Sequence, residues 1–321
     1  MNTLAPPQVS VVMPMRNAHA YVQAAVASVL QEHGVPLELV VVDDGSTDGS
    51  RELVQAVADA RVRLIDGPRR GIAACMNAGL AASRGELVMR CDADDLYPEG
   101  RIASQAAWLA MRPAHVAVCG PFSSIDARGQ LVARLWRDDL CDAHDIADEL
   151  RAGTTRTHLC CYAIRRAALV DAGLAFREFF ETAEDVDFAL RLGHLGPVGF
   201  IARGSYLYRL HEASVTHSQR EVRRVFFENV AREFAQQRAE RGSDALMDGQ
   251  PPTPPADSGS RPSAAARQIQ GMLIGGAWRA LARGQRREAM RTAWRAVATR
   301  PQVPAPWLNL LKIAVRSVVP R

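Results

Sequence analysis

Short apolar segments alternate with amphipathic segments through the first 120 residues of the chain. Runs rich in Val, Ile and Leu that are bounded by turn residues are typical of buried strands. Such runs lie at residues 9–13, 37–42, 62–65, 86–91 and 115–120. Apolar positions at helical spacing predict helices at residues 20–31, 47–58, 72–82 and 98–111. We expect Ser46 or Thr47 to cap the second helix. Strands that alternate with helices predict a parallel sheet covered on both faces.

The pattern changes after residue 120. Two apolar runs flank a turn at Asp126–Gly129, which predicts a hairpin of residues 122–125 and 131–136. Further helices are predicted at residues 143–151, 166–172, 184–193 and 219–241, with short strands at 198–201 and 205–209. The proline-rich segment 242–263 predicts a flexible linker. We therefore expect a body of residues 1–241, this linker, and a helical tail of residues 264–321.

The tail differs from the body in charge. The whole chain of 321 residues has a net charge of +4, but residues 261–321 contain twelve Arg or Lys and one acid, Glu288. Their net charge is thus +11, which leaves −7 for the rest. The tail also contains Trp278, Trp294 and Trp307, and this combination suits either contact with an anionic membrane surface, which we favour, or ordinary helix packing with solvated arginines. No recognition motif suggests nucleic acid as a partner. Helical spacing of Ala289, Ala293 and Ala296, followed by Pro301, is similar to half of a tetratricopeptide helix pair.

Cysteine usage and hydropathy predict the compartment. The six cysteines form no CxxC pair and fall mostly in apolar stretches, as reduced core cysteines do. The first residues do not have the pattern of a signal peptide, and no apolar run approaches the roughly 20 residues that span a bilayer. We expect a cytoplasmic protein that is peripheral at the inner face of the cell membrane.

Two acidic clusters follow two of the predicted strands. Asp43-Asp44 comes directly after residues 37–42, and Asp92-Ala93-Asp94 comes directly after residues 86–91. Either cluster alone is often a helix cap or a surface turn. In an open α/β sheet, however, ligands lie at the carboxyl ends of the strands, so both clusters are expected at one edge. Such an edge predicts a divalent cation, Mn²⁺ or Mg²⁺, bound together with a phosphate group.

Two further motifs lie beyond residue 180. Glu184-Asp185 opens a predicted helix, where the macrodipole favours negative charge. This placement suits a general base, and it equally suits a helix cap. His211 follows a short predicted strand, and a neutral imidazole is a common ligand of transition metals.

Taken in order, these motifs resemble those of an inverting family 2 glycosyltransferase of the GT-A fold. The resemblance covers residues 8–217, about two thirds of the chain. It implies a Rossmann-like, mostly parallel sheet flanked by helices, here with a C-terminal helical extension. The matching stretches are Val9–Asn17, Val41–Asp48, Asn77–Gly79, Ser83–Glu86, Asp92–Asp95, Ala183–Asp187, Leu190–Leu192, Tyr208–Arg209 and His211. Arg69-Arg70-Gly71-Ile72 departs from the family, which often has an asparagine-rich stretch before this glycine.

The resemblance also implies roles for individual residues. Asp185 would deprotonate the acceptor, and Asp94 with His211 would bind the metal. The residues expected to contact the nucleotide sugar are Pro14, Arg16, Asp43, Asp44, Asp92 and Glu184. The implied reaction transfers a sugar from a nucleotide-diphosphate sugar to a glycan or lipid-linked acceptor, with inversion, in bacterial cell-surface polysaccharide synthesis.

Two other functions were weighed. A sugar-phosphate nucleotidyltransferase uses a similar sheet, but it normally opens with a glycine-rich loop and a catalytic Arg or Lys. This chain has Pro14–Asn17 at that point, and its only lysine is Lys312. A non-catalytic scaffold that retains the fold is disfavoured by the intact acidic motifs.

Overall fold

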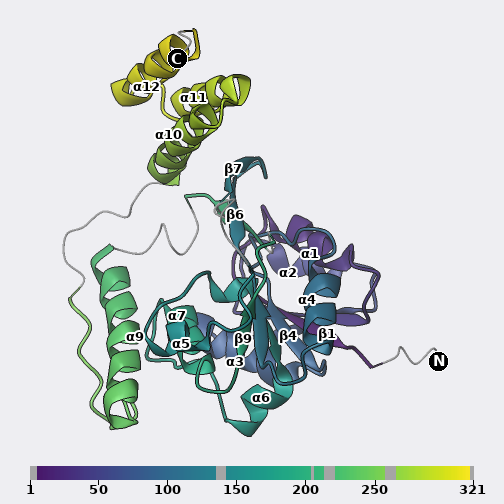
Figure 1. The fold of residues 1–321 in the computed structure, drawn as a ribbon. Helices are drawn as coiled ribbons and strands as arrows, with labels where there is room; N and C mark the ends of the chain where they lie inside the picture. Colours follow the sequence, from purple (N-terminus) through teal and green to yellow (C-terminus); the bar gives the residue numbers. More distant parts are fainter. Residues whose placement is uncertain (1–5, 135–141, 204–205, 213–220, 257–264, 319–321) are drawn as a thin grey trace. The chain divides into compact units, whose positions relative to one another are not determined.

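The computed structural model describes residues 6–134, 142–203, 206–212, 221–256 and 265–318 (Figure 1). They belong to two compact units. The first consists of Met1–Phe122, Trp136–Leu207 and Arg223–Ala256, and the second of Ser123–Leu135, Tyr208–Val222 and Asp257–Arg321. Each unit is described by itself below.

A seven-stranded sheet forms the centre of the first unit. Its strand order is β3-β2-β1-β4-β8-β5-β9, and helices flank it (Figure 1). The strands, in chain order, are β1 Val9–Met15, β2 Leu37–Asp43, β3 Val62–Asp66, β4 Leu87–Arg90, β5 Ala117–Cys119, β8 Ala163–Arg165 and β9 Val198–Phe200. β1, β2, β3 and β4 are mutually parallel, as predicted. Their carboxyl ends, including Asp43 and the segment after Arg90, therefore lie at the same edge of the sheet.

One strand of this sheet was not predicted. β8 lies between β4 and β5 and is antiparallel to both. Its three residues, Ala-Ile-Arg, are too short to show the periodicity that identifies a strand. The sheet is thus mostly parallel, as the family resemblance implied.

Alternate residues of the strands pack on opposite faces. Val12, Val40 and Val88 belong to one large core cluster that also contains residues of the helices on that face. Both faces of β1 and β2 are fully buried, which is why these strands read as continuous apolar runs. One helix approaches β1 so closely that a Cβ atom at Gly79 would lie 2.2 Å from Val12 Cγ1. Only glycine fits at this position of the Asn77-Ala78-Gly79 motif.

The helices of the first unit largely follow the predicted segments. They are α1 Val22–Leu30, α2 Ser50–Gln55, α3 Ile72–Ala82, α4 Arg101–Ala110, α5 Ala147–Arg151, α6 Arg166–Asp171, α7 Glu184–Leu192 and α9 Glu221–Arg241, with a short 3-10 helix at Leu159–Cys161. The predicted cap of α2 was wrong. The helix begins at Ser50, after Gly49 in the left-handed conformation, and Ser46 instead accepts a hydrogen bond from the backbone of Asn17.

The second unit contains a small sheet and three helices. The sheet has the order β10-β6-β7, where β6 is Phe122–Asp126, β7 is Leu131–Arg134 and β10 is Tyr206–Leu210. β6 and β7 form the predicted antiparallel hairpin. The helices are α10 Ala265–Ala282, α11 Arg286–Thr299 and α12 Pro304–Val318. Of the predicted linker 242–263, residues 257–263 lie outside the described part of the chain, whereas residues 242–256 belong to the first unit, where Asp244 is fully buried.

Small residues hold the three helices of the tail together. Ala277 and Ala280 of α10, Ala289 and Ala293 of α11, and Ile313 of α12 form one buried cluster. α10 and α11 also pack on β7 through a second cluster that includes Leu273 and Val132. None of the described helices is long and apolar enough to cross a membrane. The five cysteines in the described part of the chain are buried, as expected.

A buried glutamate joins the strands at the end of the sheet opposite to the acidic motifs. Glu38 of β2 accepts hydrogen bonds from Ser10 Oγ of β1 (2.6 Å), Arg63 Nη1 of β3 (2.7 Å) and the backbone nitrogen of Arg84 before β4 (2.7 Å). Burial alone would raise the pKa of Glu38, but the hydrogen bonds from Ser10, Arg84 and Arg63 outweigh burial and lower the pKa to about 2. The carboxylate of this β2 residue thus contacts β1, β3 and the segment that leads into β4.

We predict that Glu38→Gln destabilises the protein by about 3 kcal/mol near neutral pH, the equivalent of the pKa difference between 4.5 unfolded and about 2 folded. Because the folded pKa is the lower one, this contribution is complete above pH 4.5 and is lost as the pH falls towards 2. Urea unfolding across this pH range measures it. Glu86→Gln, at an exposed position, is the matched control. A variant difference that does not shrink in acid would contradict this account.

Candidate active site

The loops after β1 and β2 are tied to each other by backbone hydrogen bonds. Asn17, with a φ of 51°, accepts a hydrogen bond at Oδ1 from the backbone nitrogen of Thr47 (2.8 Å) and donates its own N–H to Ser46 Oγ (3.0 Å). Ala18 N donates to Ser50 Oγ (2.8 Å). Of the two residues predicted to bind the nucleotide here, Pro14 is buried within β1 and Arg16 is exposed at its end.

Asp43 and Asp44 are adjacent but have different partners. The carboxylate of Asp43 accepts hydrogen bonds from Ser46 N (2.9 Å) and Arg51 Nη1 (3.0 Å). Burial raises the pKa of Asp43, but these bonds to Ser46 and Arg51 dominate and lower it. Asp43 is therefore an ionised residue that orders the Asp43–Arg51 loop.

Asp44 instead holds the loop that departs from the family pattern. Its Oδ1 accepts a hydrogen bond from Arg69 N (2.6 Å) and its Oδ2 accepts one from Gly71 N (3.3 Å). A Cβ atom at Gly67 would lie 2.8 Å from Asp44 Oδ1, so the loop has no room for a side chain there. Arg69 has a φ of 57°, an uncommon conformation for a residue with a side chain. The two carboxylates thus bring the loops after β2 and β3 to the same edge.

A buried arginine lies at the centre of the remaining acidic residues. Arg90, the last residue of β4, contacts Asp92 Oδ1 through Nε (2.6 Å) and Glu184 Oε1 through Nη1 (3.1 Å). Its side chain is 9% exposed, and that of Glu184 is 7% exposed. Glu184 begins α7, so this guanidinium joins the DxD segment to the Glu184-Asp185 segment. The sequence motifs did not reveal Arg90, although an arginine inside an apolar strand is an unusual residue.

The charges around Arg90 are not balanced. Burial raises the pKa of Glu184 to about 7; Arg90 opposes this shift and the neighbouring Asp185 adds to it. Burial also raises the pKa of Asp92, against the effect of Arg90 and with the help of the charges of Asp94 and Asp185. Asp92, Glu184 and Asp185 therefore interact with the charge of Arg90, and Asp94 adds to the negative charge around Asp92. The structure brings these four predicted site residues together, and further positive charge would stabilise them.

Two tyrosine hydroxyl groups form hydrogen bonds with the backbone at the end of β4 and the start of the DxD segment. Asp92 N donates a hydrogen bond to Tyr206 Oη (2.9 Å), and Tyr97 Oη donates to the backbone oxygen of Arg90 (2.8 Å). The two rings meet edge to face at 5.9 Å. The guanidinium of Arg101 lies 3.9 Å from the ring centre of Tyr97. Tyr206 thus holds the backbone of Asp92, and Tyr97, which precedes α4, holds the end of β4.

Asp185 is as exposed as Asp92, whose side chain is 23% exposed. The side chain of Asp185 is also 23% exposed, and its Oδ2 is 4.0 Å from His158 Nδ1. The His158 ring is half exposed and meets the ring of Phe122 edge to face at 4.5 Å. Ala183, two residues before Asp185, has a φ of 59°, a conformation that residues with side chains adopt mainly at constrained sites. Nothing in the local sequence around His158 indicated this proximity.

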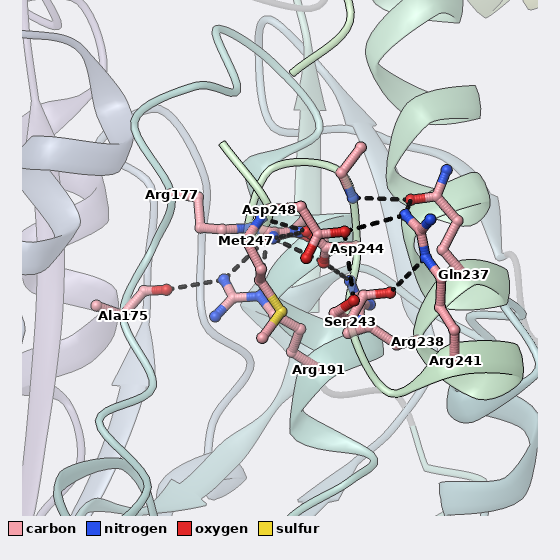
Figure 2. Close-up of polar contacts among 12 residues, drawn as sticks. Ala175, Arg177, Arg191, Gln237, Arg238, Arg241, Ser243, Asp244, Met247 and Asp248 are labelled. Carbon is pink, nitrogen blue, oxygen red and sulfur yellow. Dashed lines mark hydrogen bonds and ion pairs between the residues drawn. The ribbon is translucent and has the colours of Figure 1, made fainter. Parts of the chain in front are cut away.

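A second ion-pair network contacts α7 through Asp187, and Figure 2 shows its arginines and Asp244. Asp187 of α7 contacts Arg177 and Arg191, and Arg177 continues to Asp244 with two hydrogen bonds of 2.9 and 2.8 Å. Arg238 of α9 also contacts Asp244. Both aspartate side chains are fully buried. Asp244 thus connects α9 to the helix that carries Glu184 and Asp185.

The predicted metal ligands do not form a closed site. Among the described residues, no three His, Cys, Asp or Glu side chains are close enough to hold a metal ion. Asp94 is partly buried and sits beside Asp92 after β4, whereas His211 is a buried residue of the second unit, directly after β10. Mg²⁺ is commonly bound by one or two carboxylates together with substrate phosphates, so Asp92 and Asp94 suit such a cation.

A mostly parallel α/β sheet that gathers acidic residues at its carboxyl edge is the architecture of a GT-A-type enzyme. The family model described as Glycosyl transferase family 2 matches residues 10–172, just over half of the chain. The chain belongs to this family and is a glycosyltransferase. The predicted fold class and family are thereby confirmed, and the family match favours a glycosyltransferase over a nucleotidyltransferase.

Individual relatives agree with this assignment. The chain is 27% identical over 217 residues to the uncharacterized glycosyltransferase EpsJ of Bacillus subtilis, covering 65% of this chain and 63% of EpsJ. It is 40% identical over 97 residues to the succinoglycan biosynthesis protein ExoO of Rhizobium meliloti, covering 30% and 28%. It therefore spans less than two thirds of either relative. The crystal structure of S. aureus TarS 1–349 with UDP-GlcNAc superposes with a TM-score of 0.61 at 16% identity, covering 97% of this chain and 88% of TarS.

We predict that Asp244→Asn destabilises the first unit by about 3 kcal/mol, because it removes one partner from a buried charge network. Asp248→Asn is the matched control, since Asp248 is 40% exposed and pairs with Arg241 at 3.4 Å on the surface. This control should change the stability by less than about 1 kcal/mol. Urea unfolding followed by tryptophan fluorescence compares the two. Equal effects of the two substitutions would show that the network does not stabilise α7.

Proposed function

We propose that this enzyme transfers a sugar from a nucleotide-diphosphate sugar, with inversion, to a hydroxyl group of a glycan or lipid-linked acceptor. The observation that carries the proposal is the cluster of Asp92, Asp94, Glu184 and Asp185 around Arg90. Two findings on other proteins support it: TarS is seen with UDP-GlcNAc, and ExoO acts in succinoglycan biosynthesis. We infer that this chain acts in polysaccharide biosynthesis, on the cytoplasmic side of the cell membrane.

The loops after β1, β2 and β3 would bind the nucleoside. Pro14 and Arg16 end β1, and Asp43 and Asp44 order the neighbouring loops through Ser46 and Arg69. In this proposal one of the two carboxylates meets the base, while exposed Arg16 lies towards the phosphates. The rigid loop backbone reduces the conformational entropy that is lost on binding.

The residues around Arg90 would organise the reaction centre. Asp92 and Glu184 are held by Arg90, which fixes Asp185 relative to the DxD segment. Asp94, assisted by His211, would hold a divalent cation, which would supply positive charge to offset the negative charge of the departing diphosphate. Because four carboxyl groups surround one arginine, this edge has unbalanced negative charge to attract such a cation.

Asp185 would act as the general base. Its carboxylate takes the proton of the acceptor hydroxyl while the acceptor oxygen bonds to the anomeric carbon. The bond between this carbon and the diphosphate oxygen breaks at the same time, and the nucleoside diphosphate leaves with the electron pair. A single displacement inverts the anomeric centre, so no nucleophile from the enzyme is needed. A screen of nucleotide sugars for hydrolysis and thermal stabilisation, with and without Mn²⁺, tests the activity and identifies the donor.

We predict that Asp94→Asn abolishes the dependence of donor binding on Mn²⁺ and leaves the fold intact, because the substitution removes the negative charge that holds the cation. Calorimetric titration of the nucleoside diphosphate with and without Mn²⁺ measures this dependence. Glu99→Gln, at an exposed position shortly after the motif, is the matched control and should behave as wild type. If donor binding by Asp94→Asn depended on Mn²⁺ as in the wild type, Asp94 would not be a ligand of the metal.

We predict that Asp185→Asn keeps donor affinity and loses transfer by roughly 10³-fold, since a general base contributes on the order of 10²–10⁴-fold and acceptor orientation adds to it. Single-turnover transfer and donor titration separate the two effects. Glu181→Gln, whose side chain is 56% exposed, serves as the control. Transfer by Asp185→Asn at close to the wild-type rate would show that Asp185 is not the general base and serves only at the start of α7.

A further inference from the structure

The last helix of the tail presents an apolar surface. Trp307, Leu308, Leu311 and Val315 of α12 are 43%, 56%, 62% and 54% exposed. Their spacing of three, four and seven residues places them on one face of the helix. Ile313, on the opposite side, is fully buried against α10 and α11. We call these four residues the α12 face.

α11 extends this surface. Trp294 is 56% exposed, and its ring meets that of Trp307 edge to face at 6.0 Å. The indole nitrogen of Trp307 donates to the backbone oxygen of Pro301 (2.8 Å), so this ring is fixed in its exposed position. Two indole rings side by side, each with an apolar body and a polar N–H, are typical of surfaces at a membrane interface.

Basic side chains surround the same surface. Lys312 and Arg316 follow Leu308 by one and two turns of α12, and Arg287 and Arg291 precede Trp294 by two turns and one turn of α11. All four are exposed. Residues 261–321 contain only one acid to offset twelve Arg or Lys. Apolar and cationic groups therefore share one surface of this helical unit.

We propose that the α12 face, with Trp294, is the docking surface of this glycosyltransferase for an anionic phospholipid bilayer. Amphipathic helices with Trp and Leu on one face and Lys or Arg beside it bury their apolar face in the headgroup region. The acyl chains accommodate Leu308, Leu311 and Val315, the two indoles lie at the headgroup level, and Lys312 and Arg316 contact lipid phosphates. Such docking would keep the enzyme beside a lipid-linked acceptor.

Two other occupants fit the charges or the apolar surface less well. A second copy of the chain would place two units of net charge +11 against each other, and like charges across an interface oppose association. A nucleic acid would satisfy the arginines, but its phosphates would leave Leu308, Leu311 and Val315 without an apolar partner. A bilayer of anionic lipids satisfies both features together.

The test is co-sedimentation of the full-length protein with vesicles of phosphatidylcholine containing phosphatidylglycerol or of phosphatidylcholine alone. We expect binding to the anionic vesicles only. Leu311→Glu should weaken this binding by at least about tenfold, since a leucine that the bilayer would bury is replaced by a negative charge that the anionic lipids repel. Lys312→Glu should weaken it by about tenfold at low salt, and this difference should disappear at high salt. Val170→Glu on α6, at a position that is 64% exposed, is the matched control and should bind as wild type.

Circular dichroism and donor hydrolysis show that each variant is folded. Four results would overturn the proposal. The full-length protein ignores anionic vesicles at low salt, or Leu311→Glu binds them as wild type does. Alternatively, Leu311→Glu turns a dimer into a monomer without affecting vesicles, which makes the face an interface between copies. Binding to RNA or DNA oligonucleotides in preference to vesicles would likewise replace the membrane with a nucleic acid.

Discussion

The arrangement of the first unit depends on how one buried arginine offsets several carboxylates. Parallel strands bring their carboxyl ends to one edge, and this chain places acidic residues after both β2 and β4. Without a cation, burying Asp92 and Glu184 near Asp94 and Asp185 would be costly, because like charges repel strongly where water is excluded. Arg90 contacts buried Glu184 and partly exposed Asp92, and this contact joins the start of α7 to the end of β4. Only part of the negative charge is neutralised, so the same contact leaves the edge ready for a further cation.

The rest of the unit supports this edge from a distance. At the opposite ends of the strands, Glu38 binds Ser10, Arg63 and Arg84. These contacts maintain the register of the strands, and this register places Asp43 and Arg90 at the same edge. Beside α7, Asp187 and Asp244 are bridged by Arg177. Each of these carboxylates is buried and paired with at least one arginine. The acidic groups that support the fold are therefore paired with arginines, and Asp92 and Glu184 at the proposed reaction centre both contact the same one, Arg90.

Local patterns were sufficient for much of this account and insufficient for a definable remainder. The apolar runs of β1 and β2 and the periodicity of α3 predicted these elements because burial on both faces leaves a clear pattern. β8 was missed because three residues are too few to show an alternation of apolar and polar positions, and its place between β4 and β5 is set by packing. Arg90 and His158 were missed because their contacts join segments that are remote in sequence. The cap of α2 was misplaced because Ser46 bonds to Asn17, a partner from another loop.

The central claim is that a nucleoside diphosphate and a divalent cation bind at the carboxyl edge of the sheet, between the loops after β1 and β2 and the acidic cluster after β4. Anomalous scattering from Mn²⁺ in crystals grown with the nucleoside diphosphate of the preferred donor tests it most directly. The account predicts one strong anomalous peak within coordination distance of Asp94, about 2.1 Å from carboxylate oxygen, with the diphosphate on its other side. A nucleotide bound away from this edge, or Mn²⁺ bound without contact to Asp94, would contradict it.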